Sequence, residues 1–204
     1  MNRIITFLIA AVFCAVAVTA WGADKGVNKM KSTLRKEVQG EKGLAPKVKT
    51  FVIKSLLPSI DNPEWVKAVE EQNSKGMSLA QIQETDKAWV KAEEMLPIQK
   101  ALMNNACASE ISKLAKKYPA ILEAFVTDNQ GANVCLNNLT SDYWQGDEAK
   151  WKNSFKGGKG GVDVGKVSFD KSANANIQQV SLPILGKGGK VIGAVTFGLS
   201  VDQT

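Results

Sequence analysis

The chain of 204 residues is 44% hydrophobic and 23% charged, proportions that are typical of a folded protein and exclude a disordered or coiled-coil chain. Its 26 basic and 20 acidic residues leave a modest positive charge, without the interleaved basic and aromatic residues that would indicate nucleic-acid binding. Histidine is absent, which excludes Ser-His-Asp and Cys-His relays and imidazole zinc ligands.

The N-terminus has the order of charge, apolar run and small residues that is typical of a secretory signal peptide. Arg3 precedes an apolar run over residues 4–18, and the small residues Ala20 and Gly22 follow it. We expect residues 1–22 to be removed and the mature protein to be periplasmic or secreted. The alternative is an uncleaved membrane anchor, for which this run is short.

Residues 23–77 are predicted to be a helical N-terminal extension. Residues 24–46 are rich in Lys, Glu and Gly and have few large apolar side chains, so we expect a mobile or loosely packed leader there. Apolar residues then recur at helical spacing over residues 48–56. A second helix is predicted after Asn62, with Pro63 in its first position.

The next helical region is predicted between Ser78 and Tyr118. Ser78 and Gln81 form a capping-box pattern at its start, and Pro97 kinks or restarts the helix. Beyond Pro97, apolar side chains at steps of three and four residues share one face, which we expect to pack on a sheet. These side chains are Met103, Cys107, Ile111, Leu114 and Tyr118.

Five strands are predicted after the helices, and hairpins join them. The segments 121–127 and 132–136 enclose a tight turn, and an extended segment covers residues 162–169. Residues 177–185 and 190–201 form a second hairpin. The predicted fold is therefore α+β, with N-terminal helices and one long helix packed on a five-stranded antiparallel PAS-like sheet.

The segment between the hairpins has an unusual density of rings and polar groups. Tyr143, Trp144 and Trp151 lie with Asp142 and Gln145 in one loop and the short helix after it. Core packing alone rarely requires such a set, so we interpret the segment as the cover of a small-molecule pocket.

Two cysteines and a carboxylate pair were considered for chemistry. Cys107 and Cys135 form a candidate disulfide in an oxidising compartment, and two buried thiols are the alternative. No third ligand accompanies them, so neither a metal site nor a cofactor is expected. Asp142 with Asp147 would suit a hydrolase, but a turn role for Asp142 and helix capping by Asp147 are simpler assignments. We expect no enzyme activity.

The order of these motifs resembles the Cache domains, the extracytoplasmic PAS-like sensor modules of bacteria. The resemblance covers residues 78–204, and it rests on a long helix leading into FVTDNQGANV, then TSDYWQGDEAKW, VSFD, VSLPIL and VIGAVTFGLSVD. It implies a sheet with the long helix on one face and a small solute held under loops on the other. Typical ligands of the family are amino acids, short carboxylates and amines, which are sensed without being turned over.

The resemblance also implies six ligand-binding positions, which carry rings, a carboxylate, an amide and a hydroxyl. They are Asp142, Tyr143, Trp144, Gln145, Trp151 and Ser181.

Cache sensors generally sit between two membrane spans of a chemoreceptor, kinase or cyclase, and this sequence shows no such span or output domain. The leading hypothesis is an exported, non-enzymatic binding or sensor module that reports to a separate membrane-bound kinase, chemoreceptor or transporter. The first alternative is a periplasmic interaction or scaffold protein that docks through residues 47–95 without a ligand. The second is a hydrolase that depends on Asp142 and Asp147.

Overall fold

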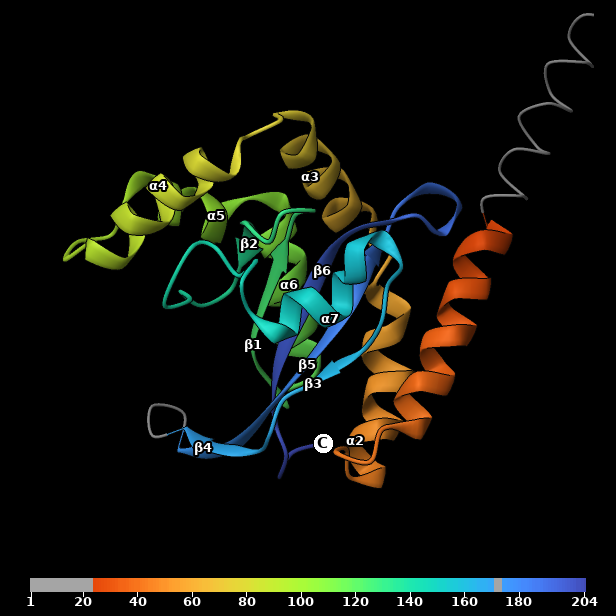
Figure 1. Ribbon diagram of the computed structural model, residues 1–204. Helices are drawn as coiled ribbons and strands as arrows, with labels where there is room; N and C mark the ends of the chain where they lie inside the picture. The colour runs from red at the N-terminus through yellow and green to blue at the C-terminus, as the bar shows by residue number, and fades with distance from the viewer. Residues whose placement is uncertain (1–23, 171–173) are drawn as a thin grey trace, which may run out of the picture.

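The computed structural model describes residues 24–170 and 174–204, and the expected signal peptide lies outside them. The described part is α+β, as predicted, with one antiparallel sheet and helices around it (Figure 1). The strands are β1 (Ile121–Thr127), β2 (Asn133–Leu136), β3 (Asp163–Val164), β4 (Ser168–Asp170), β5 (Ala175–Leu185) and β6 (Val191–Ser200).

The sheet has the order β2-β1-β6-β5-β3, and β4 pairs with β5 off this path. Both predicted hairpins are confirmed, because β1 pairs with β2 and β5 pairs with β6, each antiparallel. The last strand, β6, lies between β1 and β5 at the centre of the sheet. The predicted extended segment 162–169 is divided into β3 and β4, which both pair with β5. The result is an open antiparallel PAS-like sheet.

Most of the helices precede the sheet, and one lies between its strands. They are the helix of residues 24–40, α2 (Pro46–Phe51), the π-helical turn η1 (Val52–Leu56), the 3-10 turn η2 (Leu57–Ser59), α3 (Pro63–Ser74), α4 (Leu79–Lys91), α5 (Pro97–Asn104), α6 (Ala106–Lys117) and α7 (Ala149–Phe155).

The predicted helix starts are confirmed by their caps. The side chain of Asn62 accepts a hydrogen bond from the backbone N–H of Glu64 at 2.9 Å, with Pro63 as the first helical residue of α3. Ser78 and Gln81 form the capping box of α4. Pro97 restarts the chain as α5, since proline suits the first turn of a helix but interrupts its interior.

The expectation of a mobile or loosely packed leader after the signal peptide is wrong. Residues 24–40 form a helix, and Leu34 and Val38 are completely buried in the main core. Val27 and Met30 pack against the same core. These four apolar residues are few, but steps of three and four place all of them on one side of the helix, which is sufficient for docking.

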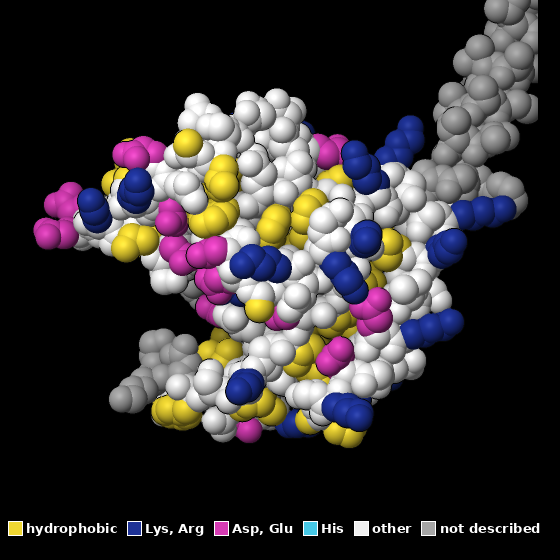
Figure 2. Space-filling model, in the orientation of Figure 1, with side chains coloured by type: hydrophobic (Ala, Val, Ile, Leu, Met, Phe, Trp, Pro, Cys, Tyr) yellow, Lys and Arg dark blue, Asp and Glu magenta, His cyan; other side chains and the backbone are white. Residues whose placement is uncertain are grey.

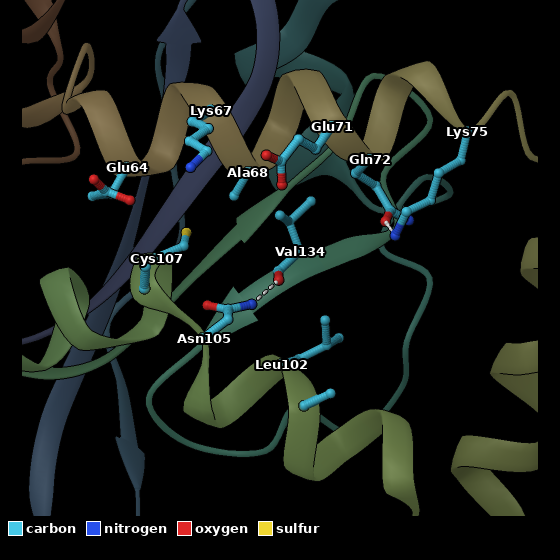
Figure 3. Close-up of a pocket in the computed structure, with 12 residues that line it drawn as sticks. Glu64, Lys67, Ala68, Glu71, Gln72, Lys75, Leu102, Asn105, Cys107 and Val134 are labelled. Atoms are coloured by element: carbon cyan, nitrogen blue, oxygen red, sulfur yellow. Dashed lines mark hydrogen bonds between the residues drawn. The ribbon is translucent and has the colours of Figure 1, made fainter.

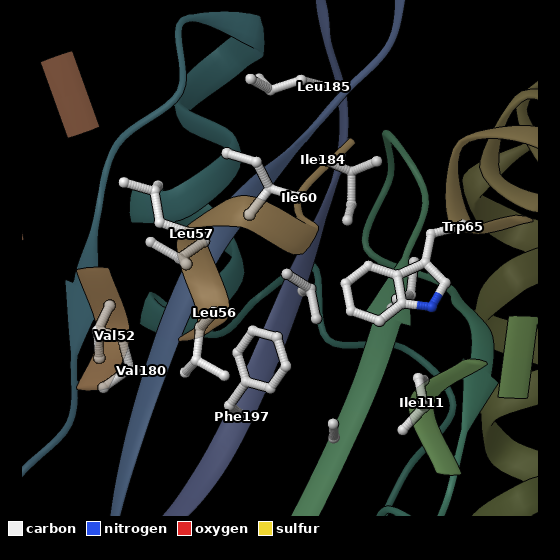
Figure 4. Packing of buried hydrophobic residues seen from close by; sticks show 14 of the residues in the cluster. Val52, Leu56, Leu57, Ile60, Trp65, Ile111, Val180, Ile184, Leu185 and Phe197 are labelled. Carbon is white, nitrogen blue, oxygen red and sulfur yellow. The ribbon is translucent and has the colours of Figure 1, made fainter. Parts of the chain in front are cut away.

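The main core lies between one face of the sheet and the helices (Figure 4). Val180 of β5 and Phe197 of β6 point into it, and Trp65 of α3 and Ile111 of α6 meet them from the other side. The ring centres of Trp65 and Phe197 are 6.2 Å apart. Helices that precede residue 78 therefore share a continuous core with the sheet.

A second, smaller core lies under α4 on the β1–β2 side of the sheet. Its buried members come from α4, the first hairpin and the loop that follows. They are Ile82, Trp89, Phe125, Ala132, Leu136 and Tyr143. Trp65 and Trp89 are thus both buried, each in a different core.

Candidate functional site

A row of three residues crosses the sheet on the face opposite the main core. Phe125 of β1 is the register partner of Thr196 of β6, which is in turn the partner of Ser181 of β5. Register partners point to the same face, so these side chains stand side by side. The hydroxyls of Ser181 and Thr196 are 2.9 Å apart, and both residues are buried. Ser181 therefore belongs to the floor of this face.

Lys150 of α7 lies above that row. Figure 1 shows α7 crossing this face of the sheet while α6 lies behind it. The Nζ atom of Lys150 is 5.3 Å from the centre of the Phe125 ring and 2.9 Å from a carboxylate oxygen of Glu148. Only 16% of the Lys150 side chain is exposed, which makes its charge a strong local feature. Sequence spacing does not reveal Lys150, since only the register of β1 and the position of α7 bring it over the Phe125 ring.

Asp142 and Gln145 lie beside this lysine and bind each other. The Gln145 Nε2 amide donates a hydrogen bond to the Asp142 carboxylate, which fixes the orientation of the amide. Gln145 is only 1% exposed, and its Oε1 atom has no hydrogen-bond partner in the part of the chain that the structure describes. A buried acceptor without a partner costs about 1–3 kcal/mol.

The charges around Asp142 disfavour its ionised form. Burial raises the pKa of the Asp142 carboxyl above its usual value, and the carboxylates of Glu148 and Asp86 raise it further. The Gln145 amide and the Lys150 ammonium oppose this shift. A cation placed between these carboxyl groups would be attracted by all three.

Tyr143 points away from this cluster into the second core. Its ring centre is 5.8 Å from that of Trp89, and its hydroxyl accepts a hydrogen bond from Gln72 Nε2 at 3.2 Å. Burial raises the pKa of the Tyr143 phenol to about 12, so the hydroxyl is neutral. The backbone N–H groups of Tyr143 and Trp144 both donate to Asp86 of α4, at 2.8 and 2.9 Å. Asp86 therefore holds the loop in place.

Trp144 and Trp151 both bind the turn between β1 and β2. The indole N–H of Trp144 donates to the carbonyl of Gln130 at 2.8 Å, and that of Trp151 donates to the carbonyl of Asp128 at 3.1 Å. Trp151 also stacks on Phe155, with ring centres 5.1 Å apart. Both tryptophans remain partly exposed. Both rings therefore lie on the side of the loop that faces the hairpin turn.

The expected capping of α7 by Asp147 is wrong. The helix begins at Ala149, and Glu148 occupies the N-cap position without a side-chain cap bond. The backbone N–H of Glu148 donates to the carbonyl of Gln145, a turn that places Glu148 directly before the helix. The carboxylate of Glu148 is therefore free to pair with Lys150.

Cys107 of α6 and Cys135 of β2 are joined by a disulfide, with their Cα atoms 5.8 Å apart. Both residues are buried in the main core. The bond fastens a helix to the strand next to β1, and so supports the side of the sheet that carries Phe125.

One surface pocket lies on the other side of the sheet from Lys150. It has a volume of about 330 Å³ and lies between α3, α5, α6 and β2 (Figure 3). Figure 3 shows Glu64, Lys67 and Glu71 along α3 on one side of the pocket, with Val134 of β2 across from the helix. Neither this pocket nor four others found in the described residues is lined by any of the six predicted ligand-binding residues.

Residues 24–170 and 174–204 contain no group of three or more His, Cys, Asp or Glu side chains that would hold a metal ion. Within the same ranges, no helix combines the length and the apolar character that a membrane span requires.

A scan against protein-family models finds no match to this chain, and a search of the curated proteins finds none either. Solved structures do match. The sensor domain of the V. cholerae histidine kinase DctB is 12% identical with a TM-score of 0.41, and the match covers 87% of this chain and 57% of that one. The sensory domain of the Campylobacter jejuni chemoreceptor Tlp3 with isoleucine bound is 18% identical with a TM-score of 0.36, over 78% and 65% of the two chains.

A third match is the ligand-binding domain of the Pseudomonas aeruginosa amino acid chemoreceptor PctC in complex with GABA. It is 10% identical with a TM-score of 0.34, over 72% of this chain and 61% of that one. The chain thus spans 57 to 65% of the length of these three domains.

Proposed function

We propose that the protein is an exported, non-enzymatic module that binds a small solute and reports its presence to a separate membrane partner of the kinase, chemoreceptor or transporter type. The observation that carries the proposal is the buried Oε1 atom of Gln145, which has no partner in the described residues. Buried amide oxygens are nearly always hydrogen-bonded, so an open one beside charged groups indicates a place for a donor.

The chemistry of the cluster favours a solute with an amino group. An ammonium would donate to Gln145 Oε1 and face the Asp142 carboxylate, where it would oppose the burial and the repulsion that raise the pKa of Asp142. Lys150 would pair with a carboxylate at the other end of the same molecule, and the ring of Phe125 would support its apolar part. An amino acid meets all of these conditions, whereas a simple amine or carboxylate meets some of them.

The remaining predicted residues would shape the site around this cluster. Trp144 and Trp151 would form an aromatic wall, Tyr143 would anchor the loop, and Ser181 would contribute to the polar floor. The hydroxyl of Ser181 is bonded to that of Thr196 rather than to a base, an arrangement for holding a molecule and not for nucleophilic attack.

The test is a thermal-shift screen with amino acids, short carboxylates and amines, followed by calorimetry of any molecule that raises the melting temperature. Gln145→Met keeps the length of the side chain but removes the open acceptor, so it should abolish the shift while leaving the protein folded. Gln178→Met is the matched control, because Gln178 is also buried, at 2% exposed, but donates to the carbonyls of Gly43 and Gly165 away from the site. It should lower stability and retain the shift.

Trp144→Ala tests the aromatic wall in the same screen, and it should also abolish the shift. If the parent protein is stabilised by none of the three solute classes at concentrations far above expected affinities, the proposal fails. If Gln145→Met and Trp144→Ala both bind like the parent, the loop is structural and the site lies elsewhere.

A further inference from the structure

The positive charge of the protein is concentrated at its N-terminal helices. Residues 24–54 contain nine basic and three acidic residues, whereas residues 55–204 contain sixteen basic and seventeen acidic ones. The whole positive excess of the chain beyond the predicted signal peptide therefore belongs to the helix of residues 24–40 and to the α2–η1 segment that follows.

The basic side chains lie on the side of these helices that faces away from the core. Lys29 and Lys36 are seven residues apart on the first helix, and Lys47 and Lys54 are seven apart on α2–η1, so each pair shares one face. All four are exposed, while the opposite side of each helix is buried in the main core. Figure 2 shows dark blue basic side chains spaced along the right-hand edge, where Figure 1 draws the helix of residues 24–40.

The two helices are held together, so the charges form one surface. Lys49 Nζ of α2 donates to the carbonyl of Gln39 at 3.0 Å, and both helices pack into the same core. Lys31 is paired with Asp61 at 2.6 Å. The exposed side chains of the basic face, by contrast, have no carboxylate within 4.0 Å among the residues that the structure describes. They are Lys29, Arg35, Lys36, Lys42, Lys47 and Lys54.

The basic face has no fully exposed large apolar side chain in the described residues, and the half-buried Phe51 lines a pocket between Lys47 and Lys54. The large apolar residues that are exposed in the described ranges all lie after residue 78, on α4, on the loops around the sheet and on β4. Protein partners are usually bound through buried aromatic or aliphatic anchors, whereas a charged lipid surface is bound through several dispersed lysines and arginines.

We propose that the basic face, formed by residues 24–54, binds the anionic headgroups of a lipid bilayer. The binding is electrostatic and peripheral, because no helix in the described residues is suited to insertion. It does not depend on the solute site, since Lys150 and Gln145 lie over the other face of the sheet. Such binding would hold an exported module at the membrane where its partner resides.

The experiment is sedimentation of the purified protein with vesicles of phosphatidylcholine, with or without phosphatidylglycerol. Parent and variants are compared in the same processed form, established by mass, because the apolar run of residues 4–18 would itself partition into lipid. The test variant replaces four lysines of the basic face by Gln: Lys29, Lys36, Lys47 and Lys54. The matched control replaces four exposed lysines elsewhere by Gln: Lys67, Lys100, Lys116 and Lys166.

The parent should bind only the vesicles that contain phosphatidylglycerol, and added salt should weaken the binding. The test variant should lose affinity by about fivefold for each lysine removed, while the control retains most of it. Circular dichroism establishes that both variants are folded. Equal binding to neutral vesicles, an equal loss in the control variant or no binding at all would each overturn the proposal. So would binding to an acidic polypeptide without binding to anionic vesicles.

Discussion

Breaking the disulfide between Cys107 and Cys135 should remove a large part of the stability of the protein. The two cysteines are 28 residues apart in the sequence, so the bond closes a loop of that length in the unfolded chain. The chain-entropy relation gives about 3.6 kcal/mol for such a loop at about 25 °C. A typical domain is stable by about 5–15 kcal/mol, so this loss would be visible in any unfolding experiment.

Urea unfolding with and without reductant measures the effect, and alkylation followed by mass measurement establishes the redox state. The untreated protein without residues 1–22, which include Cys14, should take up no alkylating agent even when unfolded, and after reduction it should take up two equivalents at Cys107 and Cys135. Its free energy of unfolding should fall by about 3–4 kcal/mol. Free thiols in the untreated, exported protein would refute the pairing. A change below about 1 kcal/mol on reduction would refute the stability argument.

Two further predictions concern the site loop. Burial and the charge of Glu148 raise the pKa of Asp142 in the folded protein, so the folded state binds the proton more tightly than the unfolded one. The free energy of unfolding should therefore fall as pH rises from the unfolded to the folded pKa of Asp142, and Asp142→Asn should remove this dependence in urea titrations. A parent protein that gains stability relative to the variant with rising pH would contradict this prediction. Gly131 has φ +87° and an added Cβ would lie 2.4 Å from the facing loop backbone, whereas Gly76 has φ +59° and open space. Gly76→Ala should lower the free energy of unfolding by about 1–2 kcal/mol, and Gly131→Ala should lower it distinctly more. Equal losses in urea unfolding would contradict this prediction and show that the facing loop shifts to make room for the added Cβ.

The strands were predictable because their signals are local. Residues 121–127 were predicted as a strand and form β1 with the same bounds, since β-branched and aromatic residues end there at a turn. Helix-start signals also act within one helical turn: the capping box of Ser78 was identified, and Pro63 indicated the helix that begins after Asn62. The helix of residues 24–40 was missed because its stability comes from docking four apolar side chains on a distant sheet, which composition does not reveal.

The position of the ring-rich loop was predictable, but the directions of its side chains were not. The loop of residues 142–151 does lie over the sheet, but the rings of Tyr143 and Trp151 point to α4 and to the hairpin turn. These directions depend on partners that come from other elements, such as Gln72 and the carbonyl of Asp128. Sequence spacing carries no information about such partners, and for the same reason it did not identify Lys150.

Three buried polar side-chain atoms in the described residues lack a hydrogen-bond partner, and their surroundings differ. The indole N–H of Trp65 belongs to a ring packed in the main core, and the same residue lines a surface pocket with Glu110 and Lys113. The open oxygen of Asn133 belongs to an amide that donates to Thr140 and to the backbone of Asp142, and so acts within the loop. The open oxygen of Gln145 belongs to an amide that donates to the half-buried carboxylate of Asp142, and the ammonium of Lys150 acts on the same carboxylate. A solute that carries its own donor and charge would offset the cost there, which is why the binding proposal depends on this atom rather than on the aromatic rings.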